Sequence, residues 1–304
     1  MAVVTKQKSP AEKLAELKAS IGGLEDLKTM SKFLLYGVSG VGKTVEAQEL
    51  AQLTTPPDKR ILYIDTGEGW VSLKNHPQLM RRTRRMTYQG LAQIELLVDA
   101  IKANLPEFDD YGTLIFDEFS TSAKQFLHLV LDANEVKMMT EAPEFKHWGI
   151  LSRNIERTLW KLLELKETHN IILIAHERTA KNKQGIEQLA PSFMDSISGS
   201  VKENMHIVAR MTAEVTNKEG APQYVRKLQV HPTKLVVAKS RIGGLDIQVP
   251  PEVFNKRLAQ WLEEGGLVDE REVVELESEK QVDQSVADQD VSFTGFEVTT
   301  EEGA

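Results

Sequence analysis

The chain has no cysteine among its 304 residues. Disulfides, thiolate metal sites and cysteine nucleophiles are therefore excluded. No apolar run approaches the ~20 residues that a membrane-spanning helix needs, and the N-terminus lacks the long apolar stretch of a signal peptide. These absences predict a cytoplasmic protein that does not interact with a membrane.

Acidic residues are concentrated at the C-terminus. The formal net charge is −8, but residues 263–304 carry 14 Asp and Glu against Arg271 and Lys280, which is −12 and leaves +4 for the rest of the chain. This tail has little apolar mass to bury and is predicted to be largely disordered. It is a solubilising appendage, a mimic of nucleic acid, or a docking tail with Phe293 and Phe296 as anchors.

The rest of the chain divides into a short leader and one domain. Residues 1–30 include an apolar pattern at helical spacing from Ala11 to Lys18, which predicts an amphipathic leader. In residues 31–262 apolar strands alternate with helices, the order that builds a mainly parallel sheet with helices on both faces. The sequence therefore predicts an α/β domain.

The expected elements change character along this domain. The predicted strands are Phe33–Tyr36, Ile61–Asp65, Thr113–Asp117 and Ile171–His176, and the predicted helices are Val45–Leu53, Leu91–Asn104, Thr121–Asn134 and Gly149–Thr168. After Met205 a β-meander is predicted, with strands His206–Thr216, Gln223–His231 and Lys234–Ser240.

A glycine-rich segment follows the first predicted strand and matches the phosphate-binding pattern G-x-x-x-x-G-K-[ST] at every fixed position. Glycines allow consecutive backbone N–H groups to turn toward a polyphosphate, and the positive end of the next helix lies at the same point. We expect ATP to bind here, with Lys43 on the β and γ phosphates and the Thr44 hydroxyl on Mg²⁺. The expected binding residues are Gly37, Val38, Ser39, Gly40, Val41, Gly42, Lys43 and Thr44.

A second part of the phosphate site is predicted from the strand Thr113–Asp117 and the Glu118 that follows it. A short apolar run that ends in an acid places a carboxylate at the carboxyl edge of a central strand. There, beside the phosphate-binding loop, Asp117 can hold a water on Mg²⁺. We therefore predict a metal-binding role for Asp117.

Hydrolysis needs a further carboxylate that orients or deprotonates the attacking water. Glu118 directly follows Asp117, an arrangement that resembles the AAA+ and helicase ATPases. Glu68 follows the strand Ile61–Asp65, a position that resembles the RecA branch. Both candidates stay open, and the RecA branch predicts that Glu68→Gln lowers turnover more than Glu118→Gln.

Two further segments resemble RecA-type proteins. Tyr63–Gly69 resembles the segment Tyr-Ile-Asp-Thr-Glu-Gly of the archaeal and eukaryotic RecA-type recombinases, with one additional residue before the glutamate. Ile171–Arg178 resembles the strand that ends in a polar γ-phosphate sensor, which implies a catalytic role for His176. The polar stretch Glu177–Ser200 then takes the place of the DNA-binding loop, and the lysines expected to contact DNA phosphates are Lys181 and Lys183.

A third segment, Leu235–Gly244, is similar to the strand end through which RecA and DnaB-like ATPases reach the nucleotide of a neighbouring subunit. The resemblance implies that Lys239 and Arg241 complete catalysis across a subunit interface. Taken together, these segments make the chain similar to the small RecA-like ATPases of tailed phages, which include single-strand-annealing recombination proteins.

The resemblance implies a RecA-like core and a cytoplasmic protein, in the host if it is phage-encoded. It further implies hydrolysis of ATP with Mg²⁺ by a homo-oligomer, a ring or filament, that acts on single-stranded DNA in recombination, annealing or repair. A single-strand-binding or replication protein is a further expected partner. The alternatives are an AAA+ or DnaB-like remodelling ATPase or helicase loader that acts on a protein partner, and a binding module without turnover. The basic run Arg81–Arg85 is either a nucleic-acid patch or a solvated turn.

Overall fold

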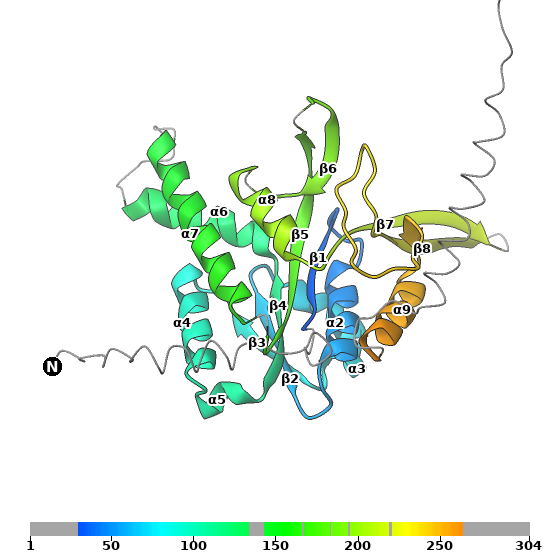
Figure 1. Cartoon of the computed structure of the whole chain (residues 1–304), viewed down its shortest axis with the longest axis horizontal. Coiled ribbons are helices and arrows are strands. Elements are labelled where there is room, and N and C mark those ends of the chain that lie inside the picture. The colour runs from blue at the N-terminus through cyan, green and yellow to red at the C-terminus, as the bar shows by residue number, and fades with distance from the viewer. Residues whose placement is uncertain are drawn as a thin grey trace, which may run out of the picture. The chain divides into compact units, whose positions relative to one another are not determined.

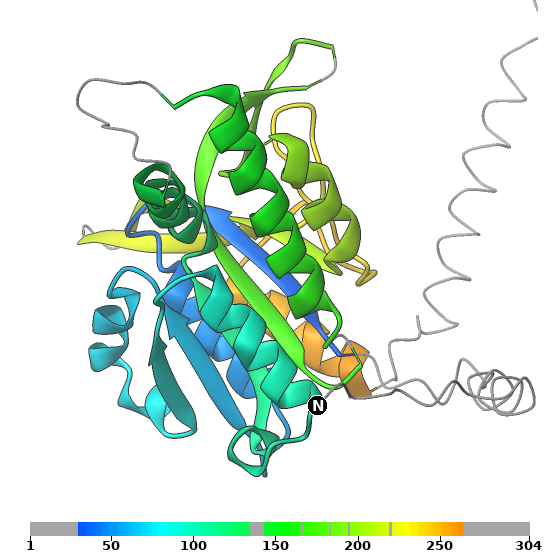
Figure 2. The same ribbon diagram turned by 90° about the vertical axis from the view of Figure 1, so that its left-hand side faces the viewer.

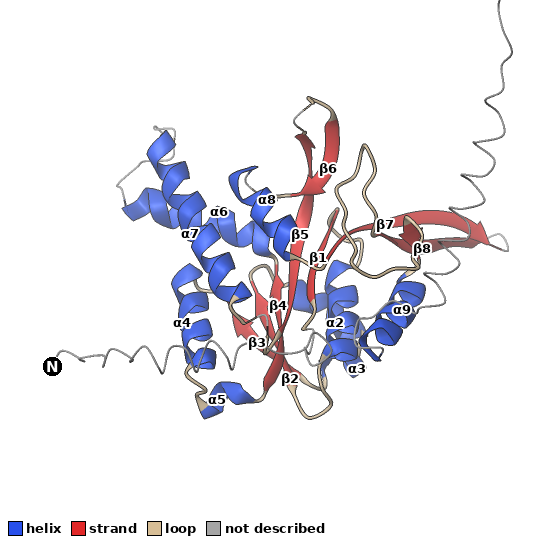
Figure 3. Cartoon of the chain, viewed as in Figure 1, coloured by secondary structure: helices blue, strands red, loops and turns tan. Residues whose placement is uncertain are grey.

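The computed structural model describes residues 30–133, 143–165, 167–182, 184–193, 195–218 and 221–263. The predicted leader up to residue 29, the acidic tail from residue 264 and Lys183 lie outside the described residues. In the described part, a nine-stranded sheet is covered by helices (Figure 1, Figure 3). The strands are β1 (Lys32–Gly37), β2 (Arg60–Asp65), β3 (Thr83–Thr87), β4 (Tyr111–Asp117), β5 (Asn170–Lys181), β6 (Glu187–Pro191), β7 (Ile207–Lys218), β8 (Ala221–Gln229) and β9 (Gln248–Val249).

The helices alternate with the strands over most of the chain, as the sequence predicts. They are α2 (Lys43–Thr54), the 3-10 helix η2 (Gly69–Asn75), α3 (Pro77–Met80), α4 (Leu91–Lys102), α5 (Pro106–Asp109), α6 (Phe119–Ala133), α7 (Phe145–Leu163), α8 (Asp195–Asn204) and α9 (Pro251–Glu263). Among the described residues, every helix is too short or too polar to cross a bilayer.

The sheet has the strand order β3-β2-β4-β5-β1-β7-β8-β9, and β6 pairs with the outer half of β5. Pairing is parallel from β3 to β7 and antiparallel for β7–β8 and β8–β9. Because parallel strands run the same way, the carboxyl ends of β1, β2, β4 and the inner half of β5 meet at one edge. The strand that carries His176 therefore lies between the strands that end at Gly37 and Asp117.

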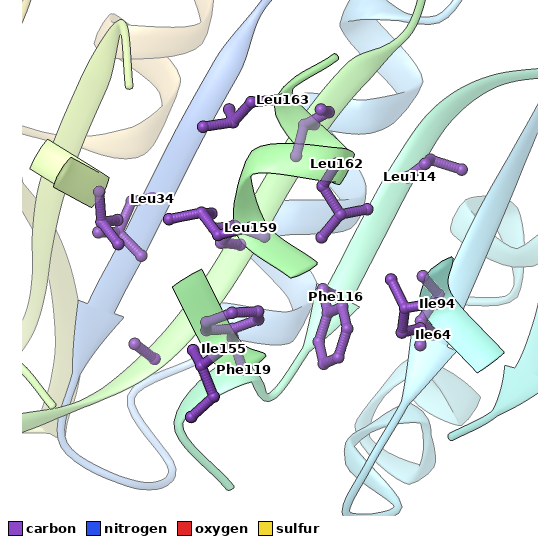
Figure 4. Close-up of a cluster of buried hydrophobic side chains, with 14 of the residues drawn as sticks. Leu34, Ile64, Ile94, Leu114, Phe116, Phe119, Ile155, Leu159, Leu162 and Leu163 are labelled. Atoms are coloured by element: carbon purple, nitrogen blue, oxygen red, sulfur yellow. The ribbon is translucent and has the colours of Figure 1, made fainter. Parts of the chain in front are cut away.

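The core consists of two hydrophobic layers, one on each face of the sheet. All six residues of β1 are buried, as expected for a central parallel strand with helices on both sides. Helices α4, α6 and α7 pack on one face, where Phe116, Ile155 and Leu159 meet (Figure 2, Figure 4). Helices α2 and α9 pack on the other face, around Leu50 and Phe254.

The structure confirms the predicted α/β class and the four predicted parallel strands. Helix α7 begins at Phe145 rather than at Gly149, because Glu144 and His147 form a reciprocal capping box that starts the helix one turn earlier. Strand β3 was not predicted, since its sequence Thr-Arg-Arg-Met-Thr lacks an apolar run.

Two predictions after β5 are wrong. The predicted strand Lys234–Ser240 makes only isolated bridges, at Val236 and Lys239, and the third strand of the meander is β9 instead. The stretch Glu177–Ser200 was predicted to be a polar loop, but most of it forms the outer half of β5, strand β6 and the start of α8. Its polar residues mark an exposed hairpin, which a hydrophobicity pattern does not distinguish from a loop.

Candidate active site

The phosphate-binding loop connects β1 to α2 at the carboxyl edge of the sheet. Gly40 and Gly42 have positive φ angles of 77° and 102°, which residues with a Cβ rarely adopt. A Cβ on Gly37 would lie 2.4 Å from the Met211 carbonyl oxygen of β7. Helix α2 begins at Lys43, so its first N–H groups point toward the loop. The loop therefore has the backbone shape that surrounds an anion.

Lys43 is buried under this loop, and its Nζ donates to the carbonyl oxygens of Gly37 and Val38 at 3.1 and 3.0 Å. Burial lowers the pKa of Lys43, while the charges of Glu118 and Asp117 act in the opposite direction. The two carboxylates therefore favour the charged ammonium. The loop carbonyls hold that charge beside the backbone that would receive the phosphates.

A cavity of about 480 Å³ opens beside the loop. It is formed by the loop, the end of β4, the segment after β2 and the middle of β5. Its lining residues are Ser39, Gly40, Gly42, Lys43, Thr44, Gly67, Gly69, Ser72, Asp117, Glu118, Thr121 and His176. A cavity of similar volume, about 490 Å³, lies around Phe108 and His169 and contains none of the predicted site residues.

Asp117 lies at the base of this cavity, at the end of β4. Its Oδ2 accepts hydrogen bonds from Thr44 Oγ1 at 2.7 Å and from the Tyr63 hydroxyl at 2.5 Å. Burial raises the pKa of Asp117, and these two hydrogen bonds oppose that shift. Gly69 packs directly against the carboxylate, because a Cβ there would lie 2.6 Å from Oδ2. The Asp117 carboxylate is therefore held in one orientation.

Tyr63 was not predicted as a site residue. The sheet register pairs Tyr63 with Ile115 and Asp65 with Asp117, so Tyr63 and Asp117 lie on the same face of neighbouring strands. The tyrosine is one of four apolar or aromatic residues in β2, and its sequence position alone gives no sign of this contact. Only the strand register reveals it.

The oxygen atoms of Thr44 and Asp117 fit a magnesium ion. Mg²⁺ prefers oxygen ligands and is usually held by one or two protein groups together with substrate phosphates and waters. Among the described residues, no group of three or more His, Asp or Glu side chains is placed to hold a metal. The hydroxyl and the carboxylate, 2.7 Å apart beside the phosphate-binding loop, would therefore hold Mg²⁺ only together with a bound nucleotide.

Glu118 and His176 line the same cavity and are in contact with each other. His176 Nε2 lies 2.5 Å from Glu118 Oε2, and Ser120 Oγ donates to Glu118 Oε1 at 3.2 Å. Burial raises the pKa of Glu118 to about 7, and burial together with the charge of Lys43 lowers the pKa of His176. Both shifts therefore favour the uncharged forms of the two side chains.

The other candidate, Glu68, lies next to the cavity but is exposed and does not line it. Glu68 directly precedes η2 and has a φ of 60°, and its neighbours Gly67 and Gly69 line the cavity instead. The structure thus brings Glu118, and not Glu68, together with Lys43 and His176.

Lys239 and Arg241 lie outside this cavity. The Lys239 ammonium donates to the carbonyl oxygens of Lys202 and Glu203 at 3.0 and 2.9 Å, in the last turn of α8, a favourable place for a cation. The two residues do not lie on one regular strand. Arg241 is exposed and near His206. The backbone N–H of His206 donates to the Lys32 carbonyl oxygen at the start of β1, the end of that strand opposite the loop.

The predicted cations of the DNA-binding stretch and the basic run have different surroundings. Lys181 is exposed at the end of β5. In the basic run, Arg82 donates to the Gln52 and Pro56 carbonyl oxygens at 2.9 and 2.7 Å, and Arg85 pairs with Asp65 at 2.6 Å. This run is therefore largely a structural element of the β2–β3 edge.

The parallel sheet, the glycine-rich loop after β1 and the acid at the end of β4 define a P-loop nucleotide-binding domain. A family model described as an AAA domain matches residues 29–242. Because the match covers more than half of the chain, the protein belongs to this AAA-domain family of P-loop ATPases. No curated protein matches the chain.

Proposed function

We propose that the protein hydrolyses ATP in the active-site cavity and that Glu118 is the base for the attacking water. The observation that supports this is the convergence of Lys43, Glu118 and His176 on one cavity, next to the hydrogen-bonded pair of Thr44 and Asp117. A binding module without turnover does not need a carboxyl group with a pKa of about 7 in the cavity, as Glu118 has.

In the proposed reaction, the water oxygen forms a bond to the γ phosphorus while the bond from the γ phosphorus to the β–γ bridging oxygen breaks. Glu118 takes the proton of the water, and ADP leaves with the bonding pair. Lys43 stabilises the charge that develops on the phosphate oxygens. Mg²⁺ held by Thr44 and Asp117 would neutralise further phosphate charge. His176, whose Nε2 lies 2.5 Å from Glu118 Oε2, orients the Glu118 carboxyl group before the nucleotide binds.

Two matched substitutions test the assignment of the base. Glu118→Gln should lower kcat by ~10²–10⁴, the usual effect of removing a positioned base, and should leave ATP binding intact. Glu68→Gln, the control, removes the same charge from an exposed side chain and should keep most of the activity. Single-turnover hydrolysis and equilibrium ATP binding separate the two steps. A larger loss for Glu68→Gln would transfer the role to Glu68.

As the macromolecular substrate we propose single-stranded DNA, bound by a homo-oligomer in recombination, annealing or repair. Support comes from β5, which carries His176 at the cavity and then continues into the hairpin with β6. One strand thus joins the active site to an exposed hairpin. Lys181 is exposed there, and Gln188 of β6 donates to the carbonyl oxygen of the exposed Lys234 at 2.9 Å.

The test is ATPase activity with and without single-stranded DNA, together with a salt titration of DNA binding. We expect DNA to stimulate the wild type. Lys181→Ala should weaken binding and reduce the salt slope by about 0.7, the value for one phosphate contact on a single strand. Lys256→Ala, an exposed lysine on α9, is the control of equal charge. An ATPase that no DNA stimulates would instead favour a remodelling ATPase that acts on a protein partner.

A further inference from the structure

A separate cavity of about 330 Å³ lies beside the first turns of α2, between that helix, β8 and the start of α9. Arg226 of β8 connects it to the active site, because its guanidinium packs against the phosphate-binding loop. A Cβ on Gly42 would lie 2.9 Å from Arg226 Cζ, and Gly42 also lines the active-site cavity. A ligand that is held by the loop can therefore extend past Arg226 into this second cavity.

Two flat side chains project into this region from β8. Tyr224 and Arg226 are two residues apart on the strand, so they leave the same face of the hairpin, and both line the cavity. The Tyr224 side chain is 78 % exposed, so one broad aromatic surface is available beside the guanidinium. Aromatic rings and guanidinium groups are the side chains on which nucleic-acid bases stack.

Carboxyl groups of α2 form the facing wall. Glu49 is half-buried and lines the cavity together with Glu46. Glu46 lies deeper, and its Oε1 has no hydrogen-bond partner among the described residues. A carboxyl group has an acceptor oxygen in either protonation state, so this wall suits a ligand that carries an N–H donor. Metal binding is not supported here, since the described part of the chain has no suitable group of His, Asp and Glu ligands.

We propose that this cavity binds the adenine base of the nucleotide whose phosphates occupy the loop, an inference that rests on the proposed function. Tyr224 and Arg226 stack on the ring, and the Glu49 carboxylate accepts a hydrogen bond from the 6-amino group. The base thus lies on the α2 side of Arg226, while the phosphates lie on the Gly42 side. The cavity makes the protein selective for ATP over a nucleotide that lacks this amino group.

Equilibrium binding of ATP and of inorganic tripolyphosphate, both with Mg²⁺, tests the stacking contact. The wild type should bind ATP more tightly, by about 5- to 100-fold, since base–aromatic stacking contributes at that level. Tyr224→Ala should lose most of this preference while its affinity for tripolyphosphate is unchanged. Phe145→Ala removes an aromatic side chain that is 92 % exposed on α7, and this control should keep the preference.

The same assay with ITP, which has a carbonyl oxygen in place of the 6-amino group, tests the role of Glu49. The wild type should prefer ATP to ITP, and Glu49→Ala should remove that preference. Equal affinity of the wild type for ATP and tripolyphosphate, or an equal loss for both ligands in Tyr224→Ala, would overturn the proposed base site. If neither ligand binds the wild type, the proposed nucleotide site at the loop fails as well. Tripolyphosphate binding by the wild type that is lost in Lys43→Ala would show that the loop binds phosphates. The failure of the base site can then be distinguished from a failure of the nucleotide site at the loop.

Discussion

At the scale of single residues, Glu46 is an ionisable group whose environment has a measurable consequence. Only 2 % of its surface is exposed, and burial, followed by the charge of Glu49, raises its pKa from 4.5 to about 7. Between these two pH values the folded state binds more protons than the unfolded chain. The free energy of unfolding should therefore decrease as the pH rises through this window, because the buried carboxyl group must ionise.

We predict that Glu46→Gln, a neutral side chain of similar shape, increases the free energy of unfolding at about pH 8 by up to ~3 kcal/mol, the equivalent of this pKa shift. Below about pH 4 the variant and the wild type should have the same stability, because Glu46 is then protonated in both the folded and the unfolded states. Urea unfolding at several pH values measures the difference. Glu107→Gln on α5, an exposed position, is the control. A gain that is larger at low pH would contradict the assignment.

At the scale of secondary-structure elements, the arginine side chains in and next to β3 attach this strand to its neighbours. The Arg82 guanidinium donates to five oxygen atoms between the end of α2 and Lys59, including the Gln52 side chain at 3.0 Å. Arg85 pairs with Asp65 and lies over the Trp70 ring, 5.0 Å from its centroid. These contacts attach the edge strand to the phosphate-loop helix and to β2.

Arg82→Ala should therefore destabilise the protein by about 1–3 kcal/mol, because several backbone carbonyl groups lose a charged donor. Arg84→Ala should change stability by less than ~0.5 kcal/mol, since this side chain is exposed and donates only weakly, at 3.3 Å, to the adjacent Thr83 carbonyl. Urea unfolding compares the two. Weakened DNA binding by Arg84→Ala with unchanged stability would instead support the interpretation of Arg81–Arg85 as a nucleic-acid-binding patch.

At the scale of the whole molecule, the positions of Lys239 and Arg241 bear on assembly. Neither lines the cavity of its own chain. Lys239 is engaged by the end of α8, whereas Arg241 is exposed. Of the two, Arg241 is the better candidate for a cation that completes the site of a neighbouring subunit.

We predict that ATPase activity per subunit rises with protein concentration, and that Arg241→Ala binds ATP but turns it over ~10³–10⁵ times more slowly. Mixing this variant with Lys43→Ala should recover part of the activity, because some interfaces then combine an intact Lys43 with an intact Arg241. The control is a mixture of Lys43→Ala with the double variant Lys43→Ala/Arg241→Ala, because this mixture contains no intact Lys43. Concentration-independent activity without recovery would show that Arg241 is a surface charge.

The amino-acid sequence by itself determined the phosphate-binding loop, the four parallel strands and Asp117 as a strand-end acid. These features depend on neighbours in the chain: glycine allows positive φ at Gly40 and Gly42, and short apolar runs form buried strands. The α/β class follows from the alternation of such runs with helices. Such properties need no knowledge of distant contacts.

Only the tertiary structure decided which side chains meet. Glu68 and Glu118 both follow apolar strands, and the fold alone places Glu118 opposite His176 while Glu68 stays exposed. Tyr63 reaches Asp117 through the register of β2 and β4, and Arg226 reaches Gly42 through the β7–β8 hairpin. These residues are far apart in the sequence, so their distances depend on strand order and register, which hydrophobic periodicity leaves undetermined.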